Sequence, residues 1–161
     1  RGLCRNSQRC ARQATAFLQS RTDWVRRAAS RSRNCLWVER DRPDPKAQRS
    51  FRHQVEELAA ALSGGLPGAN RSYRIALRSQ RSRWGSCSAR GTISINYACS
   101  RLPEPLLEYI VAHELCHLVH MNHGAAFHAL LNGMVPDGPQ RKKELSRYRI
   151  RQELDGRQPL G

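Results

Sequence analysis

Two histidines four residues apart, His113 and His117, flank a glutamate at position 114. In a helix, four residues turn the chain through 400°, so both imidazoles project from one face about 6 Å apart along the axis and can chelate one ion. Glu114 lies beside them, where a carboxylate can hold a metal-bound water and take its proton. The spacing therefore predicts a metal centre that activates water.

A catalytic zinc needs three protein ligands and one open position, and three more histidines follow the pair. His120 is nearly on the same face but lies a further turn along the axis, and His128 falls inside the next predicted helix. His123 follows a predicted break, where the reversing chain can return over the metal, and the same interval precedes the third ligand in H-E-x-x-H-x-x-G-x-x-H zinc peptidases. We predict His123 as the third ligand, with His120 as the alternative.

The expected cofactor is Zn²⁺, because three neutral imidazoles and a water match the tetrahedral preference of zinc better than the oxygen shell of calcium. The ligand pair requires a helix, which we expect to begin near Pro103 or Pro105 and to continue to about His120. Further periodic segments predict helices at 13–29, 47–63, 125–135 and 139–150, and strands at 73–78 and 92–96. We expect an α+β fold.

The two predicted strands are joined by residues 80–91, a loop rich in Ser, Gly and Arg. Arg81 and Arg83 in this loop can bind a phosphate or carboxylate of the substrate, or stabilise a developing oxyanion. The alternatives are a solvated loop or burial against a carboxylate such as Glu104 or Glu108. We predict that both arginines face an anionic group.

The net charge of +15 is unevenly distributed. Residues 1–55 contribute +10, residues 68–102 carry seven Arg and no acid, and residues 103–136 contain no Lys or Arg. Such a basic field predicts attraction to polyanions such as nucleic acid. The alternative is an Arg-rich solvated surface.

The length of 161 residues fits one domain with one sizeable core. No apolar run is long enough to span a membrane, and six Cys without any C-x-x-C favour reduced thiols and a cytoplasmic protein. We expect a basic N-terminal segment at 1–13, a domain at 14–152 and a frayed tail at 153–161. Because the chain begins with Arg1 rather than Met, we expect a truncated N-terminus; nothing in the sequence predicts an oligomeric state.

Three motifs occur in order along the chain: Arg83-Trp-Gly-Ser-Cys-Ser88, Gly91-Thr-Ile-Ser-Ile-Asn96, and the 113–117 motif followed by Asn122-His-Gly124 and Phe127. Together they resemble the YgjP-like metallopeptidase domain, a relative of the WLM and SprT-like zincins, over about residues 16–145.

The resemblance implies a zincin-like α+β fold, in which a small β-sheet packs on an active-site helix with additional flanking helices. It also implies zinc on His113, His117 and His123, with Glu114 as general base. Gly124 and His128 depart from the residues that are common in the family, and both lie beside the site, where they affect the shape offered to the substrate.

The leading hypothesis is zinc-dependent hydrolysis of peptide bonds in a peptide or protein substrate. In this hypothesis the strand at 92–96 offers its edge to an extended substrate, with Ile93 and Asn96 as substrate-binding residues. The alternatives are hydrolysis of nucleotides or other phosphorylated molecules at the same metal, and a nucleic-acid-associated protease or binding module.

Overall fold

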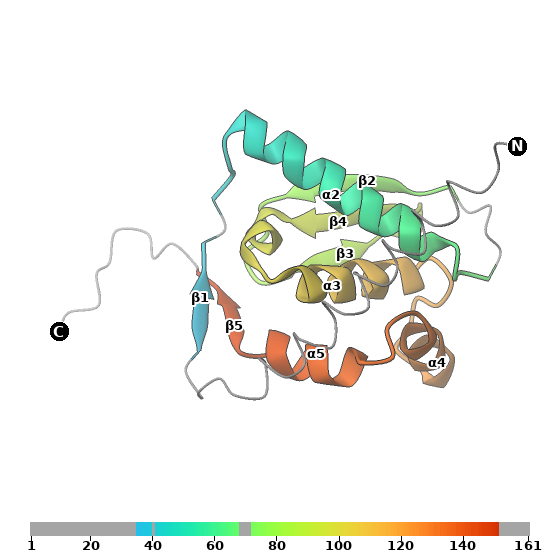
Figure 1. Cartoon of the computed structure of the whole chain (residues 1–161). Coiled ribbons are helices and arrows are strands. Elements are labelled where there is room, and N and C mark those ends of the chain that lie inside the picture. Colours follow the sequence, from blue (N-terminus) through green and yellow to red (C-terminus); the bar gives the residue numbers. More distant parts are fainter. Residues whose placement is uncertain (1–34, 40, 68–71, 152–161) are drawn as a thin grey trace, which may run out of the picture. The chain divides into compact units, whose positions relative to one another are not determined.

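The computed structural model describes residues 35–39, 41–67 and 72–151. The helix predicted at 13–29, the basic segment at 1–13 and the tail at 153–161 lie outside these residues. Within them, helices and small sheets combine in a mixed architecture (Figure 1), so the predicted α+β class is confirmed. No helix of this described part is long and apolar enough to cross a membrane.

Helix α2 (Pro45–Ser63) begins two residues before the predicted start because Asp44 caps it. One Asp44 carboxylate oxygen accepts hydrogen bonds from the backbone N–H groups of Lys46 at 2.8 Å and Ala47 at 3.0 Å, which satisfies donors that a helix start leaves free. The helix buries Phe51, Val55, Leu58 and Ala59 on one face. It ends before Gly64, as the sequence predicts.

Three strands form the main sheet: β2 (Arg74–Arg78), β3 (Gly85–Cys87) and β4 (Thr92–Asn96). Their order is β2-β4-β3, with β4 parallel to β2 and antiparallel to β3. The sequence predicts β2 and β4 but assigns β3 to a loop. Gly-Ser-Cys has no alternation of apolar and polar residues, so only its pairing with β4 makes it a strand.

The sheet has an apolar and a polar face. Ile93 and Ile95 of β4 are buried on the apolar face, and α2 and α3 (Glu104–Cys116) pack beside the sheet (Figure 1). The register places Arg74 opposite Thr92 and Ser86 opposite Ser94 on the other face. Because side chains alternate along each strand, one face of the sheet is polar and strongly basic.

Helix α3 is almost completely buried: ten of its 13 residues lie in the interior. It packs against α2, β3, α4 (Ala125–Met134) and α5 (Gly138–Leu145). A helix with apolar residues on nearly every side is stable only when it is surrounded in this way. The predicted packing of a small sheet on this helix, with flanking helices, is confirmed.

The two ends of the described part of the chain differ from the predicted elements. The helix predicted at 139–150 ends at Leu145, and Tyr148–Ile150 forms strand β5. It pairs in parallel with β1 (Leu36–Val38), which the sequence assigns to a connection. Each strand has three residues and the partners are about a hundred residues apart, so no local pattern could reveal the pairing.

A buried ion pair joins α5 to α3. Arg141 is completely buried, and one guanidinium nitrogen donates both to the Glu108 carboxylate and to the Pro105 carbonyl, the latter at 2.8 Å. Its Nε lies 3.0 Å from a carboxylate oxygen of Asp137. Since Glu108 is only 3% exposed, Arg141 rather than water compensates the charge of its carboxylate.

Arg141→Met should therefore lower the free energy of unfolding by about 3–5 kcal/mol, because it leaves the Glu108 carboxylate buried without its cation. The exposed pair of Arg101 with Asp41 provides the control, and Arg101→Met should cost at most about 1 kcal/mol. Urea denaturation followed by circular dichroism measures both. Equal, small losses would show that the buried pair contributes no more than the exposed one.

Candidate metal centre

Three imidazoles meet at the end of α3. One ring nitrogen from each of His113, His117 and His123 lies within 4.8 Å of the other two. The Nε2 atoms of His113 and His123 are 3.0 Å apart. The structure thus brings together the three ligands predicted from the sequence. In the described part of the chain, His120 and His128 are not in this cluster.

The chain turns directly after the histidine pair, which is why His123 can reach it. Helix α3 ends at Cys116 rather than near residue 120, and His117 is its C-cap. Backbone N–H groups of Leu118 and Val119 then bond to carbonyls three residues earlier, a tighter turn that is common at helix ends. The early end leaves enough chain for the reversal that returns His123 over the pair.

His120 contributes through its backbone instead of its ring. Its carbonyl oxygen lies 3.0 Å from Nδ1 of His117. A carbonyl can only accept a hydrogen bond, so this contact requires the proton on Nδ1 and leaves Nε2 free for a metal. The contact also fixes the orientation of the His117 ring.

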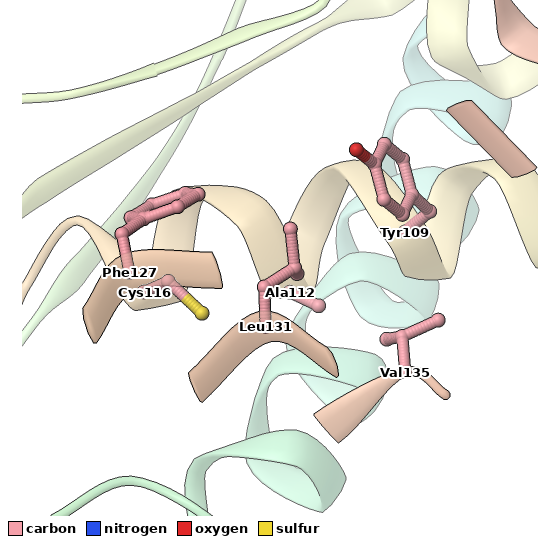
Figure 2. Close-up of a cluster of buried hydrophobic side chains, with 6 residues drawn as sticks. All are labelled: Tyr109, Ala112, Cys116, Phe127, Leu131 and Val135. Atoms are coloured by element: carbon pink, nitrogen blue, oxygen red, sulfur yellow. The ribbon is translucent and has the colours of Figure 1, made fainter. Parts of the chain in front are cut away.

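Phe127 of α4 forms the floor beneath all three imidazoles. Its ring centroid lies 4.9 Å from that of His113 and 4.7 Å from those of His117 and His123. The ring is fully buried and belongs to the hydrophobic cluster between α3 and α4 (Figure 2). Packing on this cluster restricts the rotamers of the candidate ligands.

Cys116 also belongs to that cluster and is completely buried. Its Sγ lies 3.6 Å from Sδ of Met134 (Figure 2 shows the thiol among the apolar side chains). Burial raises the pKa of this thiol to about 12. It therefore remains a neutral packing residue rather than a fourth ligand.

Glu114 is 6% exposed and lies against strand β3. A Cβ atom at Gly85 would come within 2.8 Å of both Cγ and Oε1 of Glu114, so only glycine allows this close approach. Burial raises the pKa of Glu114 to about 7, and the nearby Arg83 guanidinium opposes this shift. The carboxyl group is thus held between the metal helix and the edge of the sheet.

The donor set fits a tetrahedral zinc. Zn–N bonds of about 2.0–2.1 Å place ligand nitrogens about 3.3 Å apart, within the spacing of the three imidazoles. Burial, with the neighbouring His117 and His123, lowers the pKa of His113 to about 4. His113 is therefore neutral at pH 7, as a nitrogen ligand must be.

The expectation that 92–96 offers a free edge is wrong. Strand β4 is the central strand, paired on both sides, so its backbone groups are already bonded. Ile93 is 1% exposed and Asn96 is fully buried. Neither can contact a substrate.

Asn96 instead supports the loop between β2 and β3. Its side-chain nitrogen donates to the carbonyls of Gln80 and Arg83, each at 2.8 Å, and its oxygen accepts from the Ala98 N–H at 3.1 Å. These three bonds satisfy a buried amide and connect the loop to the sheet. Asn96 thereby positions the backbone of Arg83.

The two loop arginines have different surroundings. Arg83 is exposed, and its charge acts on Glu114. Arg81 is also exposed, and no ion pair of the described residues includes it. The alternative of burial against Glu108 is excluded, because Arg141 pairs with that carboxylate.

Sequence reasoning missed the roles of Gly85 and Phe127. Both belong to the motifs that resemble the family, but neither a glycine nor a phenylalanine by itself predicts a contact with the site residues. For Gly85, the available signal is a glycine between Trp84 and a serine in an otherwise irregular segment, because glycine in a strand often marks a close approach of another element. For Phe127, the helical position three residues after Gly124 points inward, yet only the tertiary fold shows that it touches the imidazoles.

Comparison with known proteins identifies this fold as that of a metallopeptidase. The family model described as "YgjP-like, metallopeptidase domain" matches residues 45–148, so the chain belongs to this family. The crystal structure of the metallopeptidase zymogen of Pyrococcus abyssi abylysin is similar, with 28% identity and a TM-score of 0.51. The likeness covers 58% of this chain and 90% of that one. No curated protein sequence matches the chain.

Gly85→Ala should displace the Glu114 side chain, because the new methyl group would overlap Cγ and Oε1. We expect a loss of at least about 10²-fold in kcat/KM on a fluorogenic peptide that the wild type cleaves, with metal content unchanged. Gly133→Ala is the control, since nothing lies within 4 Å of a Cβ at that position. Full activity of Gly85→Ala would contradict the tight fit around Glu114.

Proposed function

We propose that the protein is a zinc peptidase in which His113, His117 and His123 hold the metal and Glu114 is the general base. The observation that carries the proposal is the convergence of three imidazoles within 4.8 Å beside a buried carboxylate. Three neutral nitrogen ligands with one open position are typical of catalytic zinc. The family supports a peptide or protein substrate.

Zinc, when bound, supplies a Lewis acid that polarises the scissile carbonyl and acidifies a water. Glu114 accepts the proton of the attacking water on a carboxylate oxygen and passes it to the leaving nitrogen, so that the C–N bond breaks to an amine and a carboxylic acid. The contact with Gly85 keeps this carboxylate in one position. Phe127 and the His120 carbonyl orient the imidazoles.

The free edge of β3 is the proposed binding place for an extended peptide. Asn96 N–H donates to the Trp84 carbonyl and Ser88 N–H to the Thr92 carbonyl, each at 2.9 Å. In an antiparallel pair, alternate residues of a strand bond to the partner. The N–H and C=O groups of Gly85 and Cys87 therefore point away from β4. In the described residues no strand pairs with that side.

An added peptide strand at this edge would lie next to Glu114, because Gly85 touches that side chain. Backbone pairing recognises any extended chain, so side-chain specificity would be loose. Arg83, exposed near Glu114, would bind an anionic group of the substrate.

His123→Ala should weaken zinc binding by at least about 100-fold, whereas His120→Ala should change it less than about tenfold, because only the His120 carbonyl contacts the site. Competition titration against a chromophoric chelator measures both affinities. The reverse order would identify His120 as the third ligand. No zinc in either the wild type or the reconstituted protein would refute the metal assignment.

Glu114→Gln should retain zinc and lower kcat by about 10²–10⁴-fold, since the amide keeps the shape but accepts no proton. The test uses the same fluorogenic peptide, with zinc content determined by elemental analysis on the same sample. Gly133→Ala, at a position where nothing lies within 4 Å of an added Cβ, serves as the control for purification losses. Wild-type turnover by a zinc-loaded Glu114→Gln variant would show that another group is the base.

A further inference from the structure

The polar face of the main sheet is hollowed beside the hairpin of β3 and β4. The hollow has a volume of about 870 Å³. Four arginines line it: Arg74, Arg78, Arg83 and Arg90, all exposed. Its lining contains no Asp or Glu, and no carboxylate of the described residues forms an ion pair with any of the four.

The backbones of the four arginines lie in two pairs, near opposite ends of strand β2. Arg74 N–H bonds to the Gly91 carbonyl at 2.9 Å, which places Arg74 beside Arg90. At the other end, Arg78 is in register with Asn96, whose amide holds the backbone of Arg83. Four residues of strand separate Arg74 from Arg78, or about 13 Å.

This spacing favours an extended polyanion over one small anion. Two pairs of arginines whose backbones lie about 13 Å apart can reach about four phosphates of a stacked strand at 3.4 Å each. A single phosphate would instead require the four guanidinium groups to converge on one point. Between the pairs lie Ser86 and Ser94, and Thr92 lies opposite Arg74. Hydroxyl groups of this kind can donate to phosphate oxygens.

We propose that this face of the sheet binds the phosphate backbone of a single-stranded nucleic acid. Tyr73 also lines the hollow, and an aromatic ring next to a cationic groove is the combination that single-strand binding uses. The hollow shares Arg83 with the proposed peptide site, but the proposal rests on Arg74, Arg78 and Arg90 as well and stands whether or not the metal centre hydrolyses peptides.

A neighbouring hollow connects this face to the metal centre. It has a volume of about 480 Å³, shares Ser88, Arg90 and Gly91 with the first, and reaches His117. A nucleic-acid strand bound in the first hollow would therefore end beside a candidate zinc ligand. It would not use the unpaired backbone groups of the β3 edge, where we propose that a peptide binds.

The test is fluorescence anisotropy of a labelled oligothymidylate of about 20 nucleotides with the full chain, at salt concentrations from about 50 to 200 mM. The variant is R74Q/R78Q/R90Q, which spares Arg83. The matched control R49Q/K143Q/R149Q removes the same charge from exposed positions outside the hollow. This comparison is needed because residues 1–34 carry nine further Arg.

We expect R74Q/R78Q/R90Q, the face variant, to bind the oligothymidylate at least about tenfold more weakly than the wild type. The slope of log Kd against log salt concentration should fall by about 2. The control should lose less than about threefold. A third variant, R74K/R78K/R90K, keeps the charge and should retain most of the affinity, which separates a binding defect from a folding defect.

Four results would overturn the proposal. They are no binding by the wild type at the lowest salt, equal losses in the face and control variants, equal competition by polyglutamate of similar length, and equal competition by inorganic pyrophosphate. The third would indicate an acidic protein partner, and the fourth a small phosphorylated ligand.

Discussion

The burial of α3 is the constraint on which the rest of the structure depends. Ten of its 13 residues are interior, so the helix needs neighbours on nearly every side. The sheet, α2, α4 and α5 supply them. The same burial places His113 and Glu114 in a poorly solvated region, where neutral imidazole is favoured and the pKa of a carboxyl group rises.

Charge is distributed according to this burial. The helix interior tolerates Glu108 only with Arg141 beside it, and Glu114 lies where the Arg83 guanidinium partly offsets the cost of its charge. Arg74, Arg78 and Arg90 lie on the opposite, solvated face of the sheet, in a hollow that Arg83 also borders. One thin sheet thus separates the buried carboxylates from an uncompensated basic surface, and each face suits a different ligand chemistry.

Strand β3 contacts both the candidate metal centre and the basic face of the sheet. Its Gly85 touches Glu114 on the helix side, its Ser86 lies on the basic face, and its outer edge is unpaired in the described residues. Asn96, buried beneath the adjoining loop, sets the position of Arg83. Small changes in these residues would therefore affect both the carboxylate and the basic face.

The sequence alone determined the parts whose signals are local. The 113–117 spacing predicts two imidazoles on one helical face, and the prolines before it predict where α3 begins. Apolar periodicity predicts α2 and α4, and alternation predicts β2 and β4. The interval to His123 predicts a third ligand, which the structure brings within reach.

Only the tertiary structure decided the rest. Pairing with β4 makes 85–87 a strand and removes the edge expected at 92–96, and pairing of residues about a hundred positions apart makes β1 and β5. The contacts of Phe127 with the imidazoles and of Gly85 with Glu114 join separate elements. No periodicity encodes such contacts, because they depend on which elements meet in space rather than on the spacing of residues within one of them.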